Sequence, residues 1–159
     1  MSKAKTNRSS SRLAAVQALY QYAFGEKTID AVAREFLSGE IGGELIAEDE
    51  ITGSETYVPV MPAEPTLFSG ILSSYAEHAD QINEMVNSSF TDEWPAERVE
   101  LTLKAILQAG VAELIGFPKT PVAIIITEYL DLAKSFYGMQ ETKVVNGILD
   151  KLAKILREE

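Results

Sequence analysis

The chain has 159 residues, no cysteine, one histidine and a formal net charge of −10, and its length fits one domain of ordinary size. The lack of cysteine excludes disulfides, thiolate metal sites and a thiol nucleophile, and the lone His78 excludes a multi-histidine metal site. We therefore expect no metal and no cofactor. A chain without cysteine is compatible with a reducing cytoplasm, no apolar run approaches membrane-spanning length, and the polar N-terminus is unlike a secretory signal.

The positive charge is concentrated at the start of the chain. Residues 1–38 carry six basic and three acidic side chains, whereas residues 39–65 carry seven acidic side chains and no basic one. A second basic group lies near the end, in Lys143, Lys151, Lys154 and Arg157. The acidic balance argues against a general nucleic-acid binder. A local basic patch remains possible, and a solubilising N-terminal tail is the plainer interpretation.

In chain order, residues 1–8 are small, polar and basic, and we predict a disordered basic tail there. Residues 9–159 are predicted to form a single helical domain. Its first helix follows an N-capping run of serines and extends to about Phe24, and a second helix starts after Thr28.

Residues 39–65 change character, because glycines and prolines interrupt an acidic run and periodicity is weak. We predict a long acidic loop inserted into the helical domain. A loop of this length is unusual in a compact domain. Apolar residues such as Leu45 and Val58 therefore leave a surface flap or a short hairpin open as an alternative.

Helical periodicity returns after this loop. One helix starts near Pro65 and its apolar stripe extends to about Ser88, and another covers 99–114. Residues 121–136 and 142–156 form an antiparallel helical hairpin with apolar inner faces. The sequence thus predicts an all-α fold, a bundle of about six or seven helices.

We find no enzyme motif and expect no catalytic residue. The chain has no phosphate-binding glycine loop, and neither Ser38 nor Ser69 sits in the elbow pattern of a serine hydrolase. Glu113 borders an apolar stripe, and because a buried glutamate needs a partner, we expect a structural bond to a helix terminus or an arginine. Gly110 costs its helix about 1 kcal/mol relative to alanine, which predicts a close helix–helix contact.

Four stretches, in order, resemble the NusB transcription antitermination family. Residues 12–20 resemble its first helix, and residues 105–107 with Glu113-Leu114 its central helix. Residues 128–136 resemble its "NEA-(I/V)-E-LAK-F" segment, and residues 145–150 its "FVNGVLD" signature. The resemblance covers residues 9–38 and 64–157, and it implies two three-helix subbundles packed together.

The resemblance implies a regulator of transcription. Family members bind the boxA element of ribosomal RNA leader transcripts as single-stranded RNA, jointly with the ribosomal protein NusE. The complex joins RNA polymerase and suppresses premature termination. The implied RNA surface combines the basic N-terminus with the segment that leads into the last helix. Carried onto this sequence, it consists of Lys5, Arg8, Arg12, Thr142, Lys143 and Asn146.

The family docks NusE on a separate helical face. Our candidates for that face are Tyr20, Tyr22 and Lys104, because tyrosine is common at interfaces. Tyr20 lies on an apolar stripe and is alternatively a buried core residue. The chain itself is expected to be a monomer or a homodimer.

Three departures leave other functions open. Serines 9–11 occupy most of the family's arginine cluster, Thr127 replaces an asparagine, and Val144 replaces an aromatic residue. Since stacking on an aromatic contributes about 1–3 kcal/mol per base, we expect weaker RNA affinity, and the acidic loop could shield the basic site. One alternative is an all-α protein-interaction module with reduced or lost RNA binding. Another is the RNA-binding domain of a ribosomal RNA cytosine methyltransferase, which would need a catalytic domain that this sequence lacks.

Overall fold

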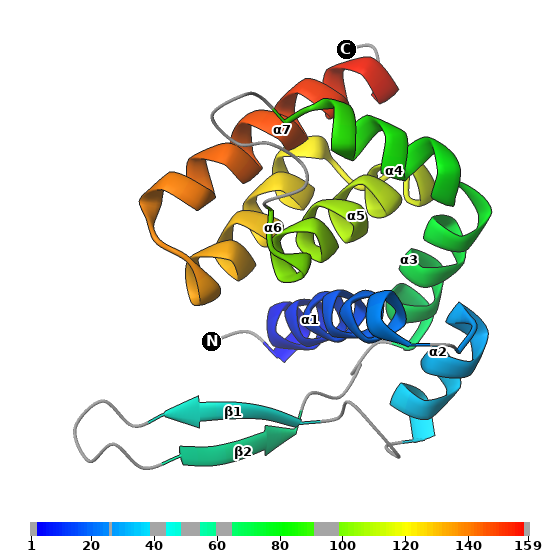
Figure 1. Cartoon of the computed structure of the whole chain (residues 1–159), viewed down its shortest axis with the longest axis vertical. Helices are drawn as coiled ribbons and strands as arrows, with labels where there is room; N and C mark the ends of the chain where they lie inside the picture. The colour runs from blue at the N-terminus through cyan, green and yellow to red at the C-terminus, as the bar shows by residue number, and fades with distance from the viewer. Residues whose placement is uncertain are drawn as a thin grey trace.

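The computed structural model describes residues 3–25, 27–38, 44–48, 55–59, 65–90 and 99–157 (Figure 1). The helices within them are α1 (Lys3–Phe24), α2 (Ile29–Ser38), α3 (Pro65–Glu77), α4 (Ala79–Ser88), α5 (Leu101–Gly116), α6 (Val122–Phe136) and α7 (Met139–Arg157). Two short strands, β1 (Glu44–Glu48) and β2 (Glu55–Pro59), form a hairpin that Figure 1 shows apart from the bundle. The predicted all-α bundle is confirmed.

The helices form two groups of three around a shared centre. Helices α1, α2 and α3 contact one another, as do α5, α6 and α7. Helix α5 joins the groups, because it also packs against α1, α3 and α4. Its interior positions, including Ile106, Leu107 and Val111, are fully buried. A helix that is apolar on most sides fits this central position.

Gly110 permits a close contact between α5 and the two helices that follow it. A Cβ atom at this position would lie 3.0 Å from Cδ2 of Leu149 in α7 and 3.6 Å from Cδ2 of Tyr129 in α6. The expectation of a close helix–helix contact is confirmed. Gly70 of α3 makes room for Phe117, the residue that follows α5, since a Cβ at Gly70 would lie 2.5 Å from Cζ of Phe117.

Three sequence-based boundaries need correction. Helix α1 begins at Lys3, so its backbone is helical through most of the predicted disordered tail of residues 1–8. The long helix predicted over 65–88 is two helices, because His78 has φ −119° and ψ 24° and turns the chain between α3 and α4. Helix α7 begins at Met139, three residues before the predicted start near Thr142.

The segment predicted as a long acidic loop, residues 39–65, contains the β-hairpin instead. Leu45 pairs with Val58 and Ile46 with Tyr57 in an antiparallel register. These residue types favour extended backbone, which explains why the hairpin alternative was the better prediction for this part of the segment. The rest of the segment lies outside the described residues, apart from Pro65, which begins α3.

Candidate nucleic-acid interface

A buried ionic network holds α1 against α5 and α6. The Arg12 guanidinium donates from Nη2 to Glu113 Oε2 at 2.7 Å and from Nε to Glu113 Oε1 at 2.9 Å. Its Nη1 donates to Glu128 Oε1 at 2.8 Å. Tyr129 donates its hydroxyl hydrogen to Glu113 at 2.8 Å, and Ser9 donates to Glu128 at 3.0 Å. The expected structural bond between Glu113 and an arginine is confirmed.

This network corrects the prediction that Arg12 contacts RNA. The Arg12 side chain is 2% exposed, and two carboxylates occupy its donors. Burial lowers the pKa of the guanidinium, but the hydrogen bonds and charge of Glu113 raise it above its ordinary value. Burial and then the charge of Glu113 raise the pKa of Tyr129 well above its ordinary value. Arg12 is therefore a structural cation that fixes the position of α1.

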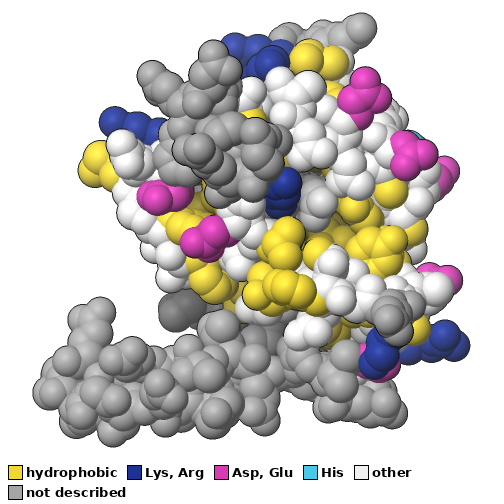
Figure 2. All heavy atoms as spheres, viewed as in Figure 1, with side chains coloured by type: hydrophobic (Ala, Val, Ile, Leu, Met, Phe, Trp, Pro, Cys, Tyr) yellow, Lys and Arg dark blue, Asp and Glu magenta, His cyan; other side chains and the backbone are white. Residues whose placement is uncertain are grey.

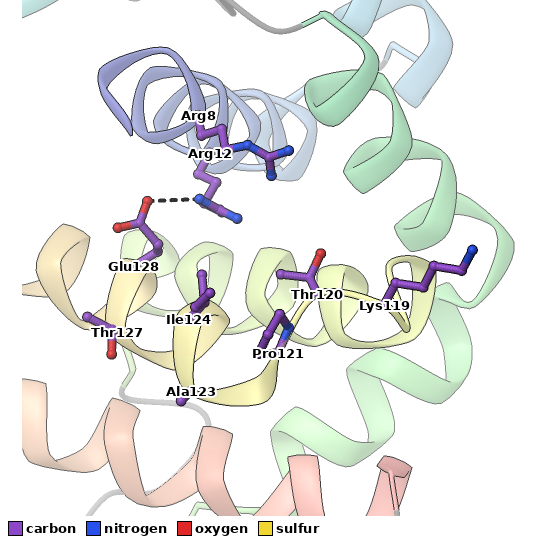
Figure 3. A pocket seen from close by; sticks show the side chains of 9 residues that line it. All are labelled: Arg8, Arg12, Lys119, Thr120, Pro121, Ala123, Ile124, Thr127 and Glu128. Carbon is purple, nitrogen blue, oxygen red and sulfur yellow. Dashed lines mark hydrogen bonds and ion pairs between the residues drawn. The ribbon is translucent and has the colours of Figure 1, made fainter. Parts of the chain in front are cut away.

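One turn before Arg12, Arg8 is exposed at a hollow of about 630 Å³ between α1 and α6. Figure 3 shows Arg8 and Arg12 on the α1 side and Ile124 and Glu128 on the α6 side. Lys119, Thr120, Pro121, Ala123 and Thr127 complete its lining. Arg12 pairs with Glu128 at this hollow, and Arg8 and Lys119 are the other two cationic residues of its lining. The hollow combines an apolar floor with cationic edges.

A second hollow, of about 390 Å³, lies between the end of α6 and the start of α7. It brings together three predicted RNA residues, Thr142, Lys143 and Asn146. Lys143 and Asn146 are exposed, whereas the Thr142 hydroxyl donates to the Gly138 carbonyl at 2.9 Å. Leu130, Lys134, Tyr137, Gly138 and Met139 complete the lining. We call this hollow the α6–α7 groove.

Tyr137 is the functional candidate that sequence reasoning missed. Its ring lines the α6–α7 groove, and its hydroxyl donates to Glu100 Oε2 at 3.0 Å. Burial and the hydrogen bond to Glu100 raise the pKa of Tyr137 to about 12, so the hydroxyl stays protonated at neutral pH. Val144, which stands where the family has an aromatic residue, lines a different hollow. An aromatic two residues before the start of α7 was the signal that could have revealed this ring.

The predicted RNA residues thus fall into two groups on either side of α6. Arg8 lines the α1–α6 hollow, and Thr142, Lys143 and Asn146 line the α6–α7 groove. Figure 1 places the α6–α7 turn on the same side of the molecule as the N-terminal end of α1. The side chain of Lys5 lies outside the described residues, although its backbone belongs to α1.

The three predicted partner residues do not share one face. Tyr20 is half-buried and makes an edge contact with Phe24 at 4.9 Å between ring centres. Tyr22 is half-buried against Tyr75, at 6.4 Å. Residues two apart on a helix point in different directions. Phe24, which is 64% exposed, is the more accessible aromatic beside Tyr20. Lys104 is half-buried on α5.

Two features of other functional classes are not found. Among the described residues, no helix is long and apolar enough to cross a membrane. Within the same part of the chain, no group of three or more histidine, aspartate and glutamate side chains could hold a metal ion.

Comparison with known proteins identifies relatives over nearly the whole chain. The model of the NusB family matches residues 9–154. The transcription antitermination protein NusB of Agrobacterium fabrum is 36% identical over 157 residues, covering 99% of this chain and 89% of that protein. The protein of the same description from Sinorhizobium fredii is 36% identical over 157 residues, covering 99% of this chain and 92% of that protein.

Solved structures share the fold at lower identity. NusB of T. maritima superimposes with a TM-score of 0.68 at 23% identity, covering 92% of this chain and 90% of that chain. A chain from a structure described as "Crystal Structure of a Plectonemic RNA Supercoil" superimposes with a TM-score of 0.66 at 19% identity, covering 94% and 95%. These two likenesses show the helical fold.

Proposed function

This chain belongs to the NusB family, and we propose that it serves transcription antitermination in the cytoplasm by binding boxA-type single-stranded RNA jointly with the ribosomal protein NusE. The family consists of transcription antitermination factors and not of enzymes. The observation that carries the proposal is the α6–α7 groove, which combines lysine, amide and aromatic groups in one hollow.

Each group in the groove suits one part of a nucleotide. Lys134 and Lys143 offer ammonium groups to phosphate oxygens, which position a strand. Asn146 carries both a donor and an acceptor and can read the edge of an unpaired base. The Tyr137 ring and the Met139 side chain, which is 75% exposed, offer an apolar surface on which a base can lie.

The acidic net charge does not oppose this assignment at close range. Figure 2 shows one face of the molecule, where Lys and Arg side chains form separate groups among apolar and acidic ones. At physiological salt the screening length is about 8 Å, so distant carboxylates act weakly on a bound strand. Arg8 and Lys119 at the α1–α6 hollow supply a second local positive region on the other side of α6.

NusE is the partner that the proposal assigns to a different surface. The Tyr20–Phe24 aromatic pair near the end of α1 is our first candidate contact, and Tyr22 and Lys104 are further candidates. Aromatic residues at helix surfaces are frequent anchors of interfaces. In this arrangement NusE and the chain would jointly hold the RNA and carry it to the RNA polymerase complex.

The alternative, a protein-interaction module without RNA binding, is favoured by one observation. Arg12, a predicted RNA contact, is buried and paired with Glu113. A salt titration of boxA RNA binding, with and without NusE, separates the two functions. Each lysine–phosphate contact should contribute about 0.7 to the logarithmic salt slope, so Lys143→Ala should flatten the slope by that amount. An RNA affinity unchanged by Lys143→Ala and Lys134→Ala would favour the protein-interaction module.

A further inference from the structure

A third hollow, of about 330 Å³, lies between the end of α4 and α7. Its lining residues are Ser89, Phe90, Lys143, Val144, Gly147, Ile148 and Lys151. Lys143 also lines the α6–α7 groove, so one ammonium group borders both hollows. We call this third hollow the α4–α7 groove.

Among the described residues, the charged side chains that line the α4–α7 groove are both lysines. Lys143 and Lys151 have no ion pair with any residue of the described part of the chain. Lys154, one turn further along α7, differs because it pairs with Asp150 at 3.2 Å. The groove is therefore a cationic exception on a chain with net charge −10.

Gly147 forms an open part of this groove. A Cβ atom added at Gly147 would meet no described residue within 4 Å, whereas one at Gly110 would lie 3.0 Å from Leu149 and one at Gly116 2.9 Å from Ser74. A glycine inside a helix costs about 1 kcal/mol relative to alanine. Packing within the chain accounts for Gly110 and Gly116, but not for Gly147. Its bare backbone leaves room for something outside the chain to approach closely.

The spacing of the two lysines suits a strand that runs along α7. Lys143 and Lys151 are eight residues apart, which is about 12 Å along the helix axis, and Gly147 lies midway. Residues four apart lie on neighbouring positions of one face. Phe90 adds an aromatic ring to the lining, and Val144 and Ile148 add apolar surface. Two cations thus flank a surface that can receive a flat, partly apolar group.

We infer that the α4–α7 groove binds the continuation of the RNA strand held in the α6–α7 groove. A nucleotide that follows the boxA element lies over Gly147 beside Phe90, with Lys143 and Lys151 on the phosphates at its two sides. This inference rests on the proposed function. RNA is the occupant because Lys143 lines both grooves and so makes them neighbours, and because two lysines without an ion pair among the described residues favour a polyanion.

The test compares two lengths of RNA in the presence of NusE. One RNA carries the boxA element alone, and the others carry it extended by several nucleotides at either the 5′ or the 3′ end. One of the extended RNAs should bind the wild-type chain more tightly than the short RNA. Lys151→Ala should remove this gain and leave the short RNA unaffected. The affinity of the extended RNA falls when salt rises from 50 to 200 mM. The loss of one phosphate contact in Lys151→Ala should make this fall about 2.6-fold smaller than in the wild-type chain, because the logarithmic salt slope changes by about 0.7.

Gly147→Gln provides a second, independent variant. Its side chain should fill the groove and remove the gain from the extended RNA. Because glutamine favours helix more than glycine does, the thermal midpoint should rise or stay unchanged, so misfolding cannot explain the lost affinity. Lys154→Ala is the matched control, since it removes a charge from the same helix at a lysine that lies outside the groove. It should retain the gain.

The outcomes separate the two proposals. If Lys143→Ala weakens the short RNA but Lys151→Ala and Gly147→Gln retain the gain, the α4–α7 groove is not part of the RNA path and only this inference fails. The same holds if neither extension raises the affinity of the wild-type chain. If the short RNA does not bind, or binds equally well to Lys143→Ala and Lys134→Ala, the proposed function fails and the inference fails with it.

Discussion

Arg12→Ala should be among the most destabilising single changes in this chain. The substitution leaves Glu113, which is fully buried, without its two-point partner and deprives Glu128 of a donor at 2.8 Å. Removing one partner of a buried ion pair costs about 3–5 kcal/mol. A domain of this kind has a total free energy of unfolding of about 5–15 kcal/mol. The variant should therefore lose a large share of its stability.

Urea denaturation followed by circular dichroism measures this loss. Arg12→Ala, Glu113→Ala and the double variant form a double-mutant cycle. The stability lost by the double variant should be smaller than the sum of the two single losses by about 1–3 kcal/mol. Arg12→Lys tests geometry, because a lysine cannot reproduce the guanidinium fork. Additive losses, or a loss below about 1 kcal/mol for Arg12→Ala, would refute the assignment of Arg12 as a buried clamp.

The same variant separates a structural role from an RNA contact. At a temperature where Arg12→Ala stays folded, the salt slope of RNA binding should be unchanged, since the guanidinium touches no phosphate. Arg8→Ala removes an exposed side chain one turn earlier and should flatten the slope by about 0.7. A flatter slope for Arg12→Ala would restore the prediction made from the sequence.

Other changes should have distinct effects. Arg157→Ala removes a guanidinium that donates to three backbone carbonyls at the end of α5 and in the following turn, so urea denaturation should show a loss of about 1.5–3 kcal/mol. Gly110→Ala should cost about 1–3 kcal/mol in the same assay, because its Cβ would lie 3.0 Å from Leu149. Burial and Glu100 raise the pKa of Tyr137 to about 12, whereas an ordinary tyrosine has a pKa of about 10. The unfolded chain then loses the proton first, so the free energy of unfolding should fall as pH rises from about 10 to about 12, and Tyr137→Phe should reduce that fall.

Local patterns predicted most of the helical architecture. Apolar residues three and four apart mark the inner faces of α5, α6 and α7, and the structure buries the centre of each stripe. Phe136 and Ile155, near the ends of the α6 and α7 stripes, are exposed instead. Chemistry predicted two contacts across helices as well. Glu113 needed a partner because a carboxylate cannot be buried alone, and Gly110 needed a close neighbour because a glycine weakens its helix.

Pairings between distant residues could not be predicted. Arg12 and Glu113 are 101 positions apart in the chain, and no periodicity indicates which arginine reaches which glutamate. The sequence therefore predicted Arg12 to be a surface cation beside Arg8. Tyr137 was missed for the related reason that its role depends on which side chains of α7 the turn at Gly138 brings beside it.

The break between α3 and α4 shows the limit of periodicity itself. The apolar stripe continues through both helices, with Ile71, Tyr75, Ile82 and Val86 all buried. The stripe therefore predicted one helix. The turn arises at His78, whose Nδ1 lies 3.1 Å from the Ser74 carbonyl and whose backbone leaves the helical region. A histidine among polar neighbours gives no signal of a break in the sequence.

The cations that are not neutralised within the described residues support the proposal that this acidic chain binds RNA. Arg12 and Lys154 are neutralised by carboxylates, and Arg157 is bound to carbonyl groups. Lys134, Lys143 and Lys151 have no ion pair with any residue that the structure describes, and all three line the hollows that flank the start of α7. Since screening confines electrostatic attraction to about 8 Å at physiological salt, these lysines and not the net charge decide where a phosphate chain lies. The RNA path should therefore follow the two grooves along α7 and not the first helix as a whole.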